Sequence, residues 1–180
     1  SILWYENNKL GRSQLSQMDK DELKPYSFRI LDEDKEGVKD IELLTREKTI
    51  IRATDYSGNS TNNVILLHMA NKSRRDYDNF ANYLKQNNLR VVSLDFRGHG
   101  DSEGDRSKFT YNDYTEMTRD VETVQKYLIN VTKEGEVSLI GAELGANVAT
   151  NYRSGNVSKL ILISPLSVSF KTIDESVVKK

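Results

Sequence analysis

The sequence has no cysteine and only two histidines, His68 and His99. The absence of cysteine excludes disulfide bonds, thiol catalysis and zinc sites built on thiolates, and it is compatible with either a cytoplasmic or an exported protein. No apolar stretch is long enough to span a bilayer, and no signal-peptide pattern is present. Because 26 basic residues nearly balance 27 acidic ones, no basic field predicts nucleic-acid binding. We expect no metal and no cofactor. Any binding partner must therefore be inferred from a local site and not from the overall charge.

The length of 180 residues is enough for one domain with a proper core and too short for two. Residues 1–37 are a polar N-terminal segment, in which 13–23 has the pattern of a short amphipathic helix. Residues 38–180 contain the regular apolar runs that are typical of a folded domain. Within it, 41–44 and 49–53 predict two strands with a tight connection, which we expect to pair as an antiparallel hairpin.

From residue 64 onward, short apolar runs alternate with amphipathic helical patterns. The apolar runs predict buried strands at four places: 64–67, 91–94, 137–140 and 160–163. Capping-box patterns that begin at Ser73 and Thr110 predict the starts of two helices, and a third helix is expected from 146 to 153. Strands that alternate with helices at this spacing predict right-handed βαβ units in a mostly parallel sheet covered on both faces.

The pentapeptide Gly-Ala-Glu-Leu-Gly at 141–145 directly follows one of these strands. A sharp strand-to-helix turn needs small residues two positions before and after its apex, because the backbone and the helix approach each other closely there. The pentapeptide therefore predicts such a turn with Glu143 at the apex. Its two glycines lack the Gly-x-Gly-x-x-Gly spacing, so it does not indicate a dinucleotide-binding site.

The stretch 64–165 resembles the α/β-hydrolase superfamily, in particular the serine-aminopeptidase and lysophospholipase-like esterase branch. Leu-Leu-His-Met-Ala at 66–70 is similar to the His-Gly segment of that family, and Leu-Asp-Phe-Arg-Gly-His-Gly-Asp-Ser at 94–102 is similar to its Asp-x-Arg-Gly-His-Gly-x-Ser loop. The turn at 141–145 matches its nucleophile elbow. The resemblance implies an α/β fold with a mostly parallel twisted sheet, helices on both faces, an N-terminal antiparallel hairpin and truncation after the sixth strand.

The resemblance also implies which residues would form a site. In the family a serine at the apex attacks an acyl carbon, a histidine takes its proton, and backbone N–H groups stabilise the oxyanion. Carried onto this chain, Glu143 holds the nucleophile position, Leu144 would supply one oxyanion N–H group, and Met69 or Ala70 the other. This sequence departs from the pattern twice, since Met69 replaces a glycine and no histidine follows Glu143.

The resemblance also implies that four further residues have a structural role, which is to order the loops around the site: His68, Asp95, Arg97 and His99.

The role of Glu143 has two interpretations. As a nucleophile it would form a covalent ester, as the aspartate of dehalogenases and epoxide hydrolases does, and an activated water would then have to cleave that ester. As a structural residue it would accept N–H bonds at the start of the following helix. We favour the structural interpretation, because the sequence offers no base for the water.

Three functions follow as hypotheses. The first is a non-catalytic hydrolase-fold protein that binds a small-molecule or acyl ligand, or a partner, at the old active-site mouth. The second is a hydrolase of carboxylic esters or small acyl substrates. The third is an assembly role through strand 160–163, which would be an uncovered apolar edge. Family members continue with two further strands that bear the acid and the histidine, so we expect either a fragment of a longer protein or a partner, including a second copy, at this edge.

Overall fold

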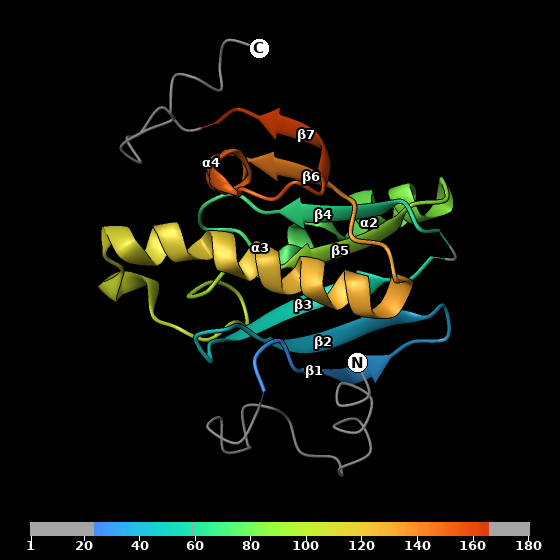
Figure 1. Cartoon of the computed structure of the whole chain (residues 1–180), viewed down its shortest axis with the longest axis horizontal. Coiled ribbons are helices and arrows are strands. Elements are labelled where there is room, and N and C mark those ends of the chain that lie inside the picture. The colour runs from blue at the N-terminus through green and yellow to red at the C-terminus, as the bar shows by residue number, and fades with distance from the viewer. Residues whose placement is uncertain (1–23, 59, 166–180) are drawn as a thin grey trace.

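The structure, a computed structural model, describes residues 24–58 and 60–165. Within these residues one sheet holds seven strands in the order β1-β2-β3-β5-β4-β6-β7 (Figure 1). Their bounds are Phe28–Glu33 (β1), Val38–Leu44 (β2), Ile50–Tyr56 (β3), Asn63–Leu67 (β4), Arg90–Leu94 (β5), Val137–Ala142 (β6) and Val157–Ile163 (β7). The helix expected at 13–23 lies outside the described residues.

Five of the seven strands run in the same direction. β4 pairs in parallel with both β5 and β6, and β6 pairs in parallel with β7. β3 is antiparallel to β5 and to β2, and β2 is antiparallel to β1, so only β1 and β3 run the opposite way. The α/β fold class, with a mostly parallel sheet and an N-terminal antiparallel hairpin, is therefore confirmed.

The helices cover both faces of the sheet. Helix α3 (Tyr111–Thr132) crosses the near face in Figure 1 beside α4 (Leu144–Asn151), while α2 (Asp78–Gln86) lies behind the sheet. Two short 3-10 turns, η3 (Arg74–Tyr77) and η4 (Arg106–Lys108), precede α2 and α3. Both predicted capping boxes are present, at Ser73 and Thr110, although the first opens η3, and α2 follows it.

The core explains why the middle strands are continuously apolar. Ile65 and Leu67 of β4 belong to the larger apolar cluster with α3 and α4, whereas Val64 and Leu66 belong to a smaller cluster with α2. Because side chains alternate between the two faces of a strand, a strand covered on both faces is apolar at every position.

The polar segment 1–37 contributes a strand that the sequence analysis did not assign. β1 pairs with β2, and Phe28 at its start is only 7 % exposed. The Phe28 ring packs edge-on against Tyr127 of α3, with ring centroids 4.9 Å apart. One aromatic contact thus joins the edge of the sheet to the helix layer.

Residues 24–58 and 60–165 include no helix that is both long enough and apolar enough to cross a bilayer.

Candidate functional site

Glu143 stands between the end of β6 and the first residue of α4. Its backbone has φ 47° and ψ −109°, a conformation that non-glycine residues rarely adopt. The N–H group of Glu143 donates to the carbonyl of Ile163 at 2.9 Å, and its carbonyl accepts from the N–H group of Asn147 at 3.1 Å. The sharp strand-to-helix turn predicted for 141–145 is therefore present, and it is tied to β7 as well as to α4.

The two glycines of this turn are required by close backbone contacts. A Cβ atom on Gly145 would lie 2.0 Å from the carbonyl oxygen of Leu67, and one on Gly141 would lie 2.4 Å from the carbonyl oxygen of Gly145. Because real Cβ contacts are never this short, neither position accepts a larger residue without a backbone shift. The first turn of α4 consequently sits directly against the end of β4.

The Glu143 carboxylate makes no capping hydrogen bond with α4. The interpretation that it accepts N–H bonds from the helix start is therefore wrong for this structure. The reason is the backbone: capping side chains reach the helix from a residue in the extended region, whereas Glu143 has a positive φ. Its side chain is half-buried at the turn.

The loop after β4 lies next to this turn. β4 and β6 are neighbours, with Leu67 in register with Gly141, so Met69 and Glu143 each lie two residues beyond this register pair. Met69 and Ala70 are half-buried, and Leu144, at the start of α4, is only 2 % exposed. The structure thus brings together the loop and the turn that the sequence analysis selected, at the carboxyl edge of the parallel strands, where ligands bind in open α/β sheets.

His68 is fully buried and both of its ring nitrogens are occupied. Nδ1 lies 2.7 Å from the carbonyl oxygen of Met69, and Nε2 lies 3.1 Å from the backbone nitrogen of Phe96. A carbonyl can only accept and an N–H group can only donate, so the ring is neutral with its proton on Nδ1. Burial lowers the pKa of His68 to about 4. His68 therefore joins the loop after β4 to the loop after β5.

His99 packs against His68, with ring centroids 5.1 Å apart. Its Nδ1 lies 3.0 Å from the carbonyl oxygen of Arg97, and its Nε2 is buried without a hydrogen-bond partner among the described residues. Burial lowers the pKa of this ring as well. The neutral His99 ring therefore stabilises the turn conformation of the loop after β5.

Arg97 forms a buried double hydrogen bond with Asp120 of α3. The Arg97 Nη2 and Nε atoms lie 2.7 and 3.0 Å from Asp120 Oδ1, and the Arg97 backbone nitrogen lies 2.9 Å from Oδ2. Burial raises the pKa of Asp120 to about 6, and Arg97 acts in the opposite direction. This pair connects the loop after β5 to α3. The sequence analysis gave Asp120 no such role, but a carboxylate on the apolar stripe of a helix was the signal for it.

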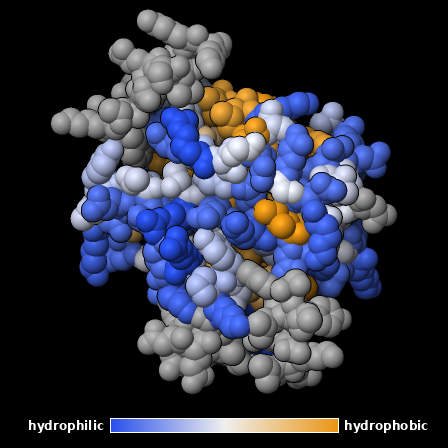
Figure 2. Space-filling view, in the orientation of Figure 1, coloured by the Kyte–Doolittle hydropathy of each residue, from blue (hydrophilic) through white to orange (hydrophobic). Residues whose placement is uncertain are grey.

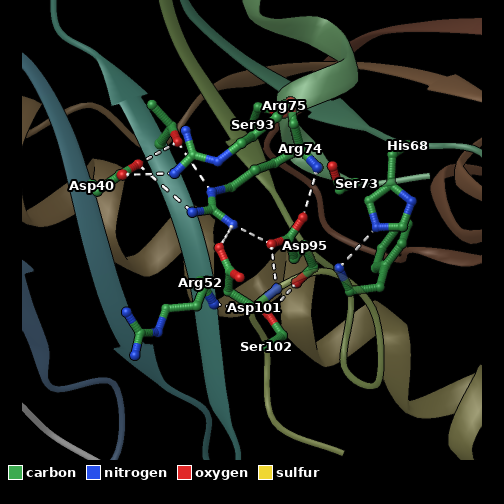
Figure 3. A network of polar contacts seen from close by, with 12 residues as sticks. Asp40, Arg52, His68, Ser73, Arg74, Arg75, Ser93, Asp95, Asp101 and Ser102 are labelled. Atoms are coloured by element: carbon green, nitrogen blue, oxygen red, sulfur yellow. Dashed lines mark hydrogen bonds and ion pairs between the residues drawn. The ribbon is translucent and has the colours of Figure 1, made fainter. Parts of the chain in front are cut away.

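Asp95 and Arg74 are the centre of a second buried network (Figure 3). Asp95 Oδ1 accepts the backbone N–H of Arg74 at 2.6 Å, its Oδ2 accepts the backbone N–H of Asp101 at 2.9 Å, and the two side chains form an ion pair. The Arg74 guanidinium also donates to Asp101 at 2.9 Å and to Thr54 at 3.1 Å. The network holds the segment that follows Met69 and Ala70 against the loop after β5. The sequence analysis read Arg74 only as part of a capping box.

The site therefore combines a strained turn, a carboxylate and two neighbouring loops on a rigid polar scaffold. Backbone N–H groups at the start of α4 can bind a carbonyl oxygen or an anion, and the Glu143 carboxylate can accept hydrogen bonds from a donor. The residues that the structure describes hold no group of three or more side chains able to bind a metal ion.

Comparison with known proteins gives one family match. The family of serine aminopeptidases, S33, matches residues 58–174. This range includes the loop after β4, the loop after β5 and the turn at Glu143.

Curated relatives match part of the chain. A monoglyceride lipase from Rattus norvegicus is 34% identical over 110 residues, which are 57% of this chain and 34% of the relative. A probable alcohol acetyltransferase from Cyberlindnera fabianii is 37% identical over 87 residues, which are 48% of this chain and 22% of the relative. The chain thus spans only about a third of one relative's length and about a fifth of the other's.

Solved structures share the fold. The esterase Pf2001 from Pyrococcus furiosus superposes with a TM-score of 0.63 at 26% identity, covering 71% of this chain and 50% of that one. The esterase EaEST from Exiguobacterium antarcticum gives 0.56 at 30% identity, covering 67% and 43%.

Proposed function

Because this chain belongs to the serine aminopeptidase family of α/β-hydrolases, we propose that it is a non-catalytic member that binds a small acyl ligand at the turn around Glu143. One observation carries the proposal. The strand-to-helix turn at 141–145 has a positive φ at its apex and two glycines that allow close backbone contacts. In this proposal the turn corresponds to a nucleophile elbow, with the Glu143 carboxylate at the position where such an elbow has a hydroxyl. Strain of this kind costs about 1–3 kcal/mol and persists where the position of a side chain matters.

The histidines support a binding role over catalysis. A serine-type or carboxylate-type mechanism needs a base, either for the nucleophile or for the water that cleaves an ester intermediate. His68 has no free nitrogen, because its proton is fixed on Nδ1 and its Nε2 accepts the Phe96 N–H. His99 is fixed in the loop after β5 by its own Nδ1, and its Nε2, which has no hydrogen-bond partner among the described residues, is shielded from water. Neither histidine of the sequence serves as base in the proposed account.

The charge of Glu143 restricts the ligand class. A carboxylate repels fatty-acid anions, and it accepts hydrogen bonds from hydroxyl or ammonium groups. Backbone N–H groups of Leu144 and of the loop at Met69 and Ala70 would bind the carbonyl or ether oxygen of the same ligand. The proposed ligand is therefore a neutral or cationic acyl or alkyl compound with a hydroxyl or amine near its head, of which a monoacylglycerol is one example.

A second candidate function is hydrolysis of carboxylic esters. The observations that favour it are the esterase and monoglyceride lipase relatives together with the retained turn. In this case the Glu143 carboxylate would attack the acyl carbon to form a mixed anhydride, and the bond to the alcohol would break as water protonates the leaving alkoxide. The hydroxide left by that water would then cleave the anhydride, which regenerates the Glu143 carboxylate and releases the acid. This alternative requires turnover that depends on Glu143, whereas the binding role requires only affinity that depends on it.

A titration with two probes tests the binding role. Butyl glyceryl ether, which cannot be hydrolysed as an ester, should bind to the wild-type chain, and butyrate should not. Glu143→Ala should weaken ether binding about tenfold, the effect of losing one hydrogen bond to a charged group. The exposed Glu134, in the segment after α3, provides the control, since Glu134→Ala should leave the affinity unchanged. Equal ether affinity in the wild type and Glu143→Ala, or no binding to either, would reject the proposal.

A further inference from the structure

The loop after β4 contains a tight turn at residues 69–72. The carbonyl oxygen of Met69 accepts the N–H of Lys72 at 3.2 Å, and Asn71, the third residue of the turn, has φ 61°. Ala70, the second residue, does not have a positive φ. The turn is therefore of type II, which requires a positive φ at its third residue and favours glycine or asparagine there.

This turn carries the N–H groups that the proposed function assigns to a ligand oxygen. The backbone N–H groups of Met69, Ala70 and Asn71 donate to no other group among the described residues. The two central residues of a turn set the orientation of the peptide group between them. A change in the φ of Asn71 would therefore turn the N–H groups away from the direction in which they now point.

The first half of the turn is anchored to the core, whereas its third residue is not. His68 Nδ1 donates to the Met69 carbonyl oxygen at 2.7 Å, and Ala70 packs against the larger apolar cluster. Asn71 is exposed. Its Oδ1 accepts a hydrogen bond from Nη1 of Arg106, which belongs to η4 in the segment after β5. Two segments that are far apart in the sequence thus meet at Asn71.

The turn η4, which carries Arg106, is itself anchored on several sides. Asp105 accepts a backbone N–H of this turn at 3.0 Å. Phe109, which directly follows η4, packs edge-on against His99, with ring centroids 6.3 Å apart. The backbone of η4 also lies close to the loop after β5, because a Cβ atom on Gly98 would stand 3.2 Å from the Arg106 nitrogen. The Arg106 side chain therefore extends from a rigid support.

We propose that Arg106 is a positioning residue of the binding site, which holds the turn at 69–72 in its binding conformation through the hydrogen bond to Asn71. The inference rests on the proposed binding function and adds to it the contact that keeps the N–H groups oriented. The loop after β4 lies between the segment after β5, which carries Arg106, and the turn at Glu143 after β6. Arg106 thus acts from the side opposite Glu143 and needs no contact with the ligand.

The size of the effect follows from where this contact lies. Figure 2 shows mostly hydrophilic residues along the left side of the molecule, the side at which β4 and β6 end in Figure 1. One hydrogen bond changes an equilibrium constant by about fivefold in net terms. Removing it lowers the population of the binding conformation, and the apparent affinity falls by no more than this population does.

Amide hydrogen exchange of Lys72 tests the contact without any ligand, because the Lys72 N–H closes the turn. The protection of this amide should fall about fivefold in Arg106→Ala. Lys108→Ala removes a charge from the same η4 turn, where Lys108 pairs with Asp105, and should leave the protection unchanged. Asn71→Gly accepts a positive φ and removes the Oδ1 acceptor. Adding Arg106→Ala to Asn71→Gly should lower the protection no further, because the contact is already lost.

Titration with butyl glyceryl ether tests the positioning role. Arg106→Ala should bind the ether about two to five times more weakly than the wild type and Lys108→Ala. Asn71→Asp, which tolerates a positive φ and keeps a side-chain oxygen, should bind it as tightly as the wild type. A variant that is only less stable remains folded without denaturant and would bind as the wild type does. A loss of affinity in Arg106→Ala therefore distinguishes positioning from stability.

Three results of the exchange experiment would overturn the proposal: unchanged protection in Arg106→Ala, an equal loss in Lys108→Ala, or a further loss in the double variant. A loss of protection that leaves the ether affinity unchanged would overturn it as well. A wild type that binds no ether would instead reject the proposed function, and the exchange of the Lys72 amide would still decide whether Arg106 holds the turn.

Discussion

His68 should make the protein less stable in acid, and the size of the effect follows from its burial. In the folded protein the pKa of His68 is about 4, against 6.5 for an exposed histidine. Between these two values the unfolded chain binds a proton that the folded protein does not. Folding stability contributed by the neutral ring is therefore complete above pH 6.5, falls as the pH decreases, and stops falling below about pH 4.

The magnitude comes from the size of the pKa shift. Each pKa unit is equivalent to about 1.4 kcal/mol, so the shift of roughly 2.5 units is worth about 3 kcal/mol in full. Between pH 7 and pH 4.5 about 2 kcal/mol of this should be lost. The structural reason is that a proton on Nε2 would face the Phe96 N–H, leaving two donors together and breaking the link between the two loops.

The measurement is urea denaturation of the wild type and His68→Gln at pH 7.0, 6.0, 5.0 and 4.5. The difference between the two proteins isolates His68, because Asp120, whose pKa burial raises to about 6, contributes with the opposite sign to both. The stability of the wild type relative to His68→Gln should fall by about 2 kcal/mol over this range. Parallel stability curves for the two proteins would refute the reasoning.

Other substitutions test the turn and the buried pair. Gly145→Ala should destabilise the protein by at least about 3 kcal/mol in urea denaturation, because its Cβ would lie 2.0 Å from a backbone oxygen of β4, while Gly155→Ala, with nothing within 4 Å, should change stability by less than about 0.5 kcal/mol. Asp120→Ala removes the close, buried partner of the Arg97 guanidinium and leaves only the longer ion pair with Glu116, so it should cost about 3–5 kcal/mol by the same measurement. Glu143→Gly should raise the melting temperature, since removing the Cβ from a residue at φ 47° relieves about 1 kcal/mol of strain; a lower melting temperature would contradict the strain argument.

The sequence was sufficient for those parts of the fold that have a local signal. The apolar runs located β4, β5 and β6, and the spacing of two glycines located the turn at Glu143 to the residue. The two capping boxes at Ser73 and Thr110 are present because the first and fourth residues of each box bond to each other and need no distant partner.

Features that depend on distant partners could not be predicted in this way. Half of the residues of β1 are polar, so its sequence has no clear strand pattern. It forms a strand because it pairs with β2 and because Phe28 packs against Tyr127 of α3. Arg74 is buried because Asp95, 21 residues away, accepts from it. The failure of Glu143 to cap α4 follows from a positive φ, which the residue type itself does not favour.

The central claim is that the turn at Glu143 binds and does not catalyse. The most direct test is the rate of p-nitrophenyl butyrate hydrolysis by the wild-type chain, measured beside Glu143→Ala and Glu134→Ala at equal concentration. The account predicts that all three rates equal one another and stay at the level of the buffer. A wild-type rate above buffer that Glu134→Ala retains and Glu143→Ala loses would contradict it and establish Glu143 as a catalytic carboxylate.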